Sequence, residues 1–235
     1  MRKLTMVIFV LALAASALGQ DVVVADFEGG LNNGDWWWGP IAADVIEPTG
    51  GNPGGYLGNA FQDTPFPVLK SGWDAEGFCG DLTSAVRISG DFQTFESSNA
   101  WIGDFYFTVL FRNHMGTPDD FEDDVFVYID PYNYDCPDIG EGWKHYEFDL
   151  PFAFEGAPGE LPAGWVGGSY LTGNATFPDD ITFQEVVSNV GRVEFWFNHP
   201  DWAAIFATFN TGVDNIVLDL DDPVAFPNEN PVATG

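Results

Sequence analysis

Carboxylates stand at the edges of two apolar, strand-like segments that lie at opposite ends of the chain. Glu28 ends the first of these segments and Asp214 begins the last. Because a closed β-sandwich often pairs its first and last strands, we expect the two acids to come together and to form a cation site. Asp214 falls on the same strand face as Ile216 and Leu218, so its carboxylate should point toward the apolar side, where it needs a partner. The alternative is that Asp214 only accepts hydrogen bonds from loop amides.

A second candidate site lies on an alternating segment nearer the C-terminus. Trp196 shares one strand face with Arg192, Glu194 and Asn198, and Tyr128 lies on the outward face of another segment. A sugar site uses a flat ring that stacks against C–H groups, flanked by planar polar side chains that fix the orientation. These residues therefore predict a carbohydrate-binding face. The alternative is that the long loop ahead of this segment covers the face and that Trp196 is merely packed.

The sequence gives little support for catalysis. Glu147 and Asp149 begin like the E-x-D-x-x-E pattern of a jelly-roll glycosidase, but Phe152 occupies the third acidic position. A two-carboxylate hydrolase needs paired acids in a cleft, and we can nominate no such pair. The serines lack a G-x-S-x-G context, and the cysteines show no catalytic signature. We therefore predict no catalytic residues and a protein that is not an enzyme.

The chain contains two cysteines, Cys79 and Cys136. A secreted protein permits a disulfide, and two cysteines allow only one intramolecular pairing. We therefore expect a disulfide between Cys79 and Cys136, with two buried free thiols as the alternative.

Three consecutive tryptophans, Trp36 to Trp38, stand in the first long loop region. Because side chains alternate along an extended chain, all three cannot point inward. At least one should be exposed or covered by a loop. One interpretation is contact with a partner, and the other is packing of the loop onto the edge of the domain.

The framework that must position these residues is predicted to be an antiparallel all-β domain. Period-two patterns separated by Gly, Pro and Asn are typical of such domains, and the size and strand number favour a sandwich or jelly roll. One short helix is expected where Thr182 and Glu185 form a capping box ahead of apolar residues at helical spacing. The expected strands lie within residues 22–28, 86–92, 105–112, 124–130, 145–150, 192–198 and 214–220.

Composition limits the location and the partners. A basic start, a short apolar run and small residues are typical of a secretory signal, so we expect residues 1–19 to be removed, residues 20–220 to form the domain and residues 221–235 to be a disordered tail. No later segment is apolar enough to insert in a membrane. Seven basic against 36 acidic residues give a net charge of −29, which argues against nucleic acid and anionic membranes as partners.

Several short motifs occur in a recognisable order. They are D-F-E-G-G at 26–30, G-G-N-P-G-G-Y-L at 50–57, W-x-x-Y-x-F at 143–148, R-V-E-F at 192–195 and G-V-D-N-I-x-L at 212–218. In this order they resemble the laminin B (laminin IV type) domain of bacterial secreted proteins. The chain is also similar to the galactose-binding-like jelly rolls, which include several carbohydrate-binding modules.

The resemblance implies an extracellular β-sandwich with a non-catalytic role. Such jelly rolls often hold a structural calcium between the first strand, a nearby loop and the last strand, which implies that Glu28, Asp214 and oxygens around Asn52 bind calcium, a cation that takes about six to eight oxygen ligands. We therefore predict a secreted carbohydrate-binding module whose partner is an extracellular glycan or surface polymer. The alternatives are a structural or adhesive surface protein without a small ligand and, third, a glycoside hydrolase or lyase.

Overall fold

The structure of the chain is a computed structural model. The structure describes residues 21–39, 44–59, 62–64, 67–98, 102–117, 121–169, 176–200 and 207–220. The predicted signal, residues 1–19, and the predicted tail, residues 221–235, lie outside the described residues.

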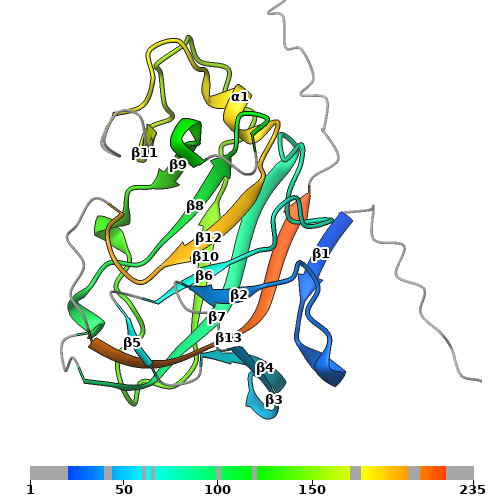
Figure 1. Ribbon diagram of the computed structural model, residues 1–235, viewed down its shortest axis with the longest axis vertical. Helices are drawn as coiled ribbons and strands as arrows, with labels where there is room; N and C mark the ends of the chain where they lie inside the picture. Colours follow the sequence, from blue (N-terminus) through cyan, green and yellow to red (C-terminus); the bar gives the residue numbers. More distant parts are fainter. Residues whose placement is uncertain are drawn as a thin grey trace, which may run out of the picture.

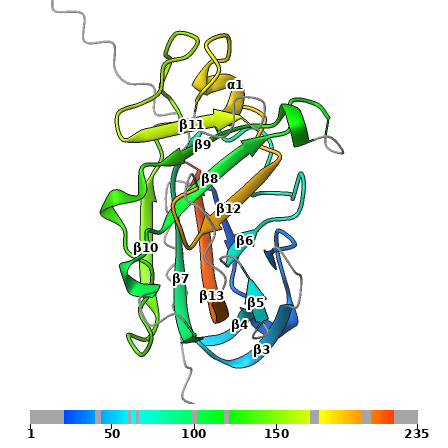
Figure 2. The same cartoon turned by 60° about the vertical axis from the view of Figure 1, so that its left-hand side comes forward.

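The described chain forms two antiparallel sheets that lie as two layers of a β-sandwich (Figures 1 and 2). The larger sheet has the hydrogen-bonded order β10 (Lys144–Asp149), β7 (Ala85–Ser97), β13 (Ala207–Leu220), β4 (Gly54–Asn59) and β3 (Asp44–Gly51), with β1 (Asp21–Ala25) and β5 (Gln62–Thr64) also paired to β13. The smaller sheet has the order β11 (Trp165–Ser169), β9 (Val125–Ile129), β8 (Thr108–Asn113), β12 (Arg192–Trp196), β6 (Val68–Lys70) and β2 (Trp37–Gly39). The predicted all-β jelly-roll sandwich is confirmed.

The first and last described strands pair with each other, as expected. β1 runs antiparallel to the second half of β13, with Val23 opposite Leu218. The other edge of this part of β13 pairs with β7. β13 therefore ties the start of the domain to the middle of the larger sheet, and Figure 1 shows β1 beside it.

The core between the sheets is largely aromatic because alternate residues of the central strands are large and apolar. On β8 and its preceding residue, Phe107, Val109 and Phe111 face inward and are fully buried. Their rings and those of the other sheet interlock, with Phe107 and Phe92 centroids 4.8 Å apart in an edge-to-face arrangement. Leu110, on the opposite face of β8, is also buried, so this strand is covered on both sides as its sequence predicts.

The predicted helix is α1 (Phe183–Val187), and the capping box that begins it is complete. The backbone N–H of Glu185 donates to Thr182 Oγ1 at 3.1 Å, and the backbone N–H of Thr182 donates to Glu185 Oε2 at 2.6 Å. The apolar face of α1 is buried against β8 and β9 at one end of the sandwich (Figure 1). Four 3-10 turns complete the described elements: η1 (Glu28–Gly30), η2 (Ile102–Asp104), η3 (Phe121–Asp123) and η4 (Pro131–Asn133).

The predicted disulfide is not formed, because the fold places the two cysteines against different partners. Cys79 lies in the connection between β6 and β7, where its Sγ is 3.5 Å from Ser71 Oγ. Cys136 is buried beside the residues that lead into β8, and its Sγ donates to the Tyr106 carbonyl at 3.2 Å. Both are free thiols, as in the alternative interpretation, although only Cys136 is buried and Cys79 is half-buried. Among the described residues, no helix has the length and hydropathy needed to cross a bilayer.

Candidate functional site

The outer face of the smaller sheet, which points away from the core, carries a continuous row of large and charged side chains. Strand pairing aligns one residue from each of the six strands across this face. From β2 to β11 the row reads Trp37, Lys70, Glu194, Leu110, Tyr128 and Val166. We call this surface the outer face. Arg192 lies in the neighbouring row on one side, opposite Arg112, and Trp196 lies in the row on the other side, opposite Thr108.

A buried ion-pair network lies at the centre of the outer face. The guanidinium of Arg112 donates to both carboxylate oxygens of Glu194, at 3.1 and 3.3 Å, and to Asp124 Oδ2 at 3.3 Å. The Trp196 indole N–H donates to Glu194 Oε2 at 2.8 Å. Burial raises the pKa of Glu194, but the charges of Arg112 and Lys70 and these hydrogen bonds outweigh it and lower the pKa to about 2. These hydrogen bonds hold the side chains of Glu194 and Arg112 in place next to Trp196.

A cluster of aromatic rings and cations lies at the β2 end of the outer face. The guanidinium carbon of Arg192 lies 3.6 Å from the ring centroid of Trp73 and 5.7 Å from that of Trp37. The ammonium of Lys70 lies 5.2 Å from the Trp37 centroid. Gly39 leaves room for the Lys70 side chain, because a Cβ at this position would come within 3.2 Å of Lys70 Cε. All four side chains are half-buried, so each retains a solvent-accessible part.

Aromatic rings continue from the row toward the opposite end of the face. The imidazole of His199 lies 6.0 Å from the Tyr128 ring and 5.5 Å from the Tyr132 ring, and Tyr106 lies 4.9 Å from Tyr132. Tyr128 and His199 are buried, whereas Tyr132 is 58% exposed. This group forms an aromatic edge on the same side of the sheet.

The structure brings four of the five predicted sugar-binding residues, Arg192, Glu194, Trp196 and Tyr128, to one face, and it places Asn198 just beyond the end of β12. The five residues differ in exposure. Trp196 and Arg192 are half-buried. Tyr128, Glu194 and Asn198 are at most 2% exposed, so neighbouring side chains cover them and they offer almost no surface to a ligand. The reason for the difference is local: Glu194 is enclosed by its bond to Arg112, and Tyr128 packs with neighbouring apolar side chains, Leu110 and Phe126.

Lys70 and Trp73 were missed by the sequence reasoning, and Trp37 was considered only as one of three consecutive tryptophans of which at least one should be exposed or covered by a loop. Trp37, Lys70 and Trp73 come from β2, β6 and the connection after β6, which the alternation patterns did not predict. The sequence contained a signal for Trp37, because side chains alternate along an extended chain. Since Trp36 and Trp38 are buried, Trp37 must point away from the core. No comparable signal indicated Lys70 or Trp73.

The predicted cation-site residues converge on one turn, between β3 and β4. Asp214 Oδ2 accepts a hydrogen bond from the Asn52 backbone N–H at 2.6 Å, and Glu28 Oε1 accepts one from the Gly55 backbone N–H at 2.9 Å. Glycines permit this approach, since a Cβ at Gly51 would lie 2.6 Å from Asp214 Oδ2. Glu28 does not end the first strand as predicted: β1 ends at Ala25, and Glu28 lies in the turn η1 that follows it. The sequence nevertheless brought together residues that do meet, from η1, the turn at Asn52 and the last strand.

The route by which Asp214 becomes buried differs from the prediction. β13 has a register shift after Asp214: Asp214 pairs with Asp91 and Val217 pairs with Ser89, so three steps on β13 match two on β7. Asn215 supplies the extra residue and has a φ of 50°, a left-handed conformation that Asn tolerates. The shift moves Asp214 off the face of the apolar residues that follow it. It is buried instead by the turn at Asn52.

The surroundings of Asp214 are rich in oxygen and poor in cations. Burial, opposed by hydrogen bonds from the Asn52 and Asn215 backbones and assisted by the charges of Asp91 and Glu28, raises the pKa of Asp214 to about 6. Such a donor set has the hard-oxygen character that calcium prefers. Within the described ranges, however, no three His, Cys, Asp or Glu side chains are grouped so that they could hold a metal ion. A cation here would therefore need backbone or amide oxygens as additional ligands.

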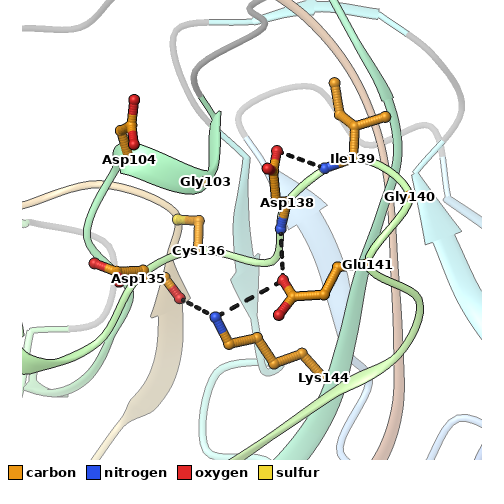
Figure 3. Close-up of a pocket in the computed structure, with 9 residues that line it drawn as sticks. All are labelled: Gly103, Asp104, Asp135, Cys136, Asp138, Ile139, Gly140, Glu141 and Lys144. Atoms are coloured by element: carbon orange, nitrogen blue, oxygen red, sulfur yellow. Dashed lines mark hydrogen bonds and ion pairs between the residues drawn. The ribbon is translucent and has the colours of Figure 1, made fainter.

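A separate, open hollow of about 460 Å³ lies between η2 and the segment that leads into β10 (Figure 3). The Lys144 ammonium contacts the Asp135 carbonyl at 3.3 Å and Glu141 Oε2 at 3.8 Å. Glu141 and Asp138 in turn accept hydrogen bonds from the backbone of their own loop. The carboxylates of Asp138 and Glu141 are thus occupied in holding the loop, and none of the predicted site residues lines the hollow.

Comparisons with known proteins yield likenesses of structure only. No family model and no curated protein sequence matches the chain, so the resemblance to the laminin B domain stays a prediction. Solved structures that are similar include a family 11 carbohydrate-binding module from Clostridium thermocellum in complex with a β-1,3-1,4-mixed-linked tetrasaccharide, with TM-score 0.45, 15% identity, and coverage of 84% of this chain and 94% of that chain.

Two other solved structures, an enzyme and an adhesin domain, are also similar to this chain. One is an exo-β-agarase, with TM-score 0.43 and 15% identity; the match covers 84% of this chain and 24% of the agarase chain. The other is the K1 cleaved adhesin domain of Lys-gingipain from Porphyromonas gingivalis W83, with TM-score 0.35, 12% identity, and coverage of 86% of this chain and 99% of that domain.

Proposed function

We propose that the chain is a secreted, non-catalytic module that binds carbohydrate on the outer face of the smaller sheet. The observation that carries the proposal is the arrangement of Trp37 and Trp196, two half-buried rings on either side of the fixed Glu194–Arg112 pair. A sugar would stack its C–H face on a ring while its hydroxyls bond to the partly exposed side chains of Arg192 and Lys70 beside the rings.

The support beneath the rings favours recognition. Glu194 is held by two of the three guanidinium nitrogens of Arg112 and by the Trp196 indole, and Trp196 packs against a cluster that contains Leu110, Phe126 and Tyr128. Side chains held this firmly lose little conformational entropy when a ligand binds. The outer face therefore has the rigidity expected of a binding surface.

One observation favours the runner-up, a structural or adhesive protein without a small ligand. Tyr128, Glu194 and Asn198 are buried, which leaves a smaller accessible surface than the sequence predicts. An adhesive surface would bind a polymer weakly over many contacts, whereas a sugar site would depend on one or two rings.

Binding of the full chain to an array of soluble polysaccharides, followed by affinity electrophoresis, tests the proposal. Trp196→Ala and Trp37→Ala should each abolish retention by the polysaccharide that binds while lowering the melting temperature by only about 2–4 °C. Trp143→Ala is the matched control: Trp143 is also half-buried, but it lies on the other sheet, where its indole donates to the Gly50 carbonyl. Binding that survives both outer-face substitutions would contradict the proposal.

We further propose that calcium binds at the junction of Glu28, Asp214 and the turn at Asn52. The support is the convergence of two carboxylates on one turn and the electrostatic strain that burial and neighbouring acids impose on Asp214. A cation bound only to the folded state would stabilise it by about 2.7 kcal/mol at a hundredfold excess over Kd.

Thermal unfolding in calcium and in EDTA tests this site. Calcium should raise the melting temperature by on the order of 5–10 °C for a domain of this size, and Glu28→Gln should remove most of that response. Glu155→Gln, at an exposed glutamate remote in sequence from the turn, is the control and should respond like the parent. Equal melting temperatures in calcium and EDTA would exclude the site.

A further inference from the structure

The outer face concentrates positive charge in a strongly acidic protein. The whole chain carries seven Lys and Arg residues against 36 Asp and Glu residues. Five of the basic residues lie in the described part, and three of them, Lys70, Arg112 and Arg192, occupy neighbouring positions on the outer face. Arg112 and Arg192 stand directly opposite each other across β8 and β12. Such a grouping is costly unless each charge has a partner.

Partners are present for three of these five residues but not for the other two. Arg87 pairs with Glu147 and Asp149, Lys144 pairs with Glu141, and Arg112 pairs with Glu194 and Asp124. Within the part of the chain that the structure describes, the side chains of Arg192 and Lys70 form no ion pair and no hydrogen bond, and Arg192 Nε is buried without an acceptor.

Their surroundings make this lack of a partner unfavourable. Burial lowers the pKa of Arg192 and of Lys70, and each also feels repulsion from Arg112. Glu194 attracts both, but its carboxylate oxygens are already bonded to Arg112 and Trp196. The rings of Trp37 and Trp73 provide contact for the cations without neutralising them. The two cations are thus held in place with open hydrogen-bond capacity.

We propose that the ligand of the outer face is an anionic polysaccharide whose carboxylate or sulfate group is bound by Arg192 and Lys70 beside the ring of Trp37. The proposal rests on the proposed carbohydrate-binding function and adds the charge class of the sugar. A guanidinium presents donors in a planar fork that matches carboxylate and sulfate oxygens, and an ammonium adds a point charge. Trp37 would stack on the sugar ring that bears the anion.

A polysaccharide suits this site better than a nucleic acid. The net charge of −29 opposes the binding of any polyanion, and only two unpaired cations are available on this face, so contact with the charged groups must be supplemented by stacking on Trp37. A glycan presents its anion next to an apolar sugar face, which is the combination that the cation pair and Trp37 can bind.

Isothermal titration of the full chain with matched pairs of polysaccharides tests the inference. One pair is polygalacturonate and the same polymer with its carboxyl groups reduced to alcohols. The other pair is a sulfated galactan and its desulfated form. At least one charged polymer should bind about tenfold or more tightly than its uncharged counterpart, a ratio that corresponds to about 1.4 kcal/mol. The pair that shows the difference identifies the anion as carboxylate or sulfate.

Substitutions locate the effect. Arg192→Gln and Lys70→Gln should each reduce the affinity for the charged polymer about tenfold and leave any affinity for the neutral polymer unchanged. Arg87→Gln and Lys144→Gln, which remove positive charge from other parts of the surface, should change neither affinity. If Arg192→Gln lowers the melting temperature, Arg192→Lys serves as the second variant, since it keeps the charge and loses the fork.

The outcomes separate the two proposals. Equal binding of charged and uncharged polymers overturns the anionic ligand and leaves the carbohydrate-binding function in place. Binding of neither kind overturns both. A preference for the charged polymers that Arg87→Gln reduces as much as Arg192→Gln assigns it to general electrostatics and also overturns the inference.

Discussion

Asp214 on β13 stands directly opposite Asp91 on β7, and the two residues are only 0% and 6% exposed. His145 on β10 stands on the other side of Asp91, with its Nδ1 2.7 Å from Asp91 Oδ1. Asn215 donates to Asp91 Oδ2 at 2.9 Å. Asp91 therefore contacts the side chains of His145 and Asn215. Within the described residues, Asp214 accepts hydrogen bonds only from backbone N–H groups. Burial and the neighbouring charge of Asp91 therefore raise the pKa of Asp214.

The first prediction concerns the pH dependence of stability. Burial raises the pKa of Asp214 to about 6, against about 3.9 in an unfolded chain. Between these values the folded state binds a proton that the unfolded state does not, so this group lowers stability as the pH rises from about 4 to 6. In EDTA, Asp214→Asn should remove that slope, and its stability relative to the parent should increase over this window and level off above it. Urea unfolding at several pH values measures this, and parallel curves would contradict it.

The second prediction concerns Glu194. Because the native pKa is lowered to about 2, against about 4.3 when unfolded, its contribution is complete above the unfolded value and is lost as the pH falls toward 2. Glu194→Gln leaves the buried Arg112 without its bidentate partner and should cost about 3–5 kcal/mol in urea unfolding at pH 7. Arg87→Gln, at an exposed ion pair, should change stability little. Equal losses in the two variants would show that burial does not set the cost.

The third prediction concerns the thiols. Burial raises the pKa of Cys136 well above its usual value and also raises that of Cys79, so both should be protonated and slow to react at neutral pH. A chromogenic disulfide reagent should react slowly with the folded chain and titrate two thiols per chain after denaturation without reductant. Finding no thiols in the denatured protein would restore the disulfide.

The fourth prediction separates two neighbouring tryptophans. Trp38 is fully buried, and its indole donates to the Leu57 carbonyl at 3.2 Å. Trp38→Ala should therefore cost about 3–5 kcal/mol in the free energy of unfolding. Trp37 faces outward, so Trp37→Ala should cost on the order of 1 kcal/mol and act mainly on binding. Denaturant titration compares the two, and a larger loss for Trp37→Ala would place it in the core.

Local patterns in the sequence were sufficient for the elements and for many side-chain directions. Alternation along residues 105–112 and 192–198 placed Phe107 and Phe195 inside, and the Thr182–Glu185 box located the helix. These features depend on residues a few positions apart, so they can be read without knowledge of the rest of the chain. The pairing of the first and last strands also followed, because sandwich closure requires it.

Tertiary structure alone decided the composition of the two candidate sites. The extra residue at Asn215 changed the face on which Asp214 lies and set it opposite Asp91. The register of β12, β6 and β2 placed Glu194, Lys70 and Trp37 in one row, although they are far apart in the sequence. Strand order, register and bulges arise from the packing of the whole domain, and a one-residue shift exchanges the faces of a strand. Alternation therefore predicted which residues share a face wherever the strand is regular, and the fold determined where a bulge breaks that pattern and which neighbours the residues meet.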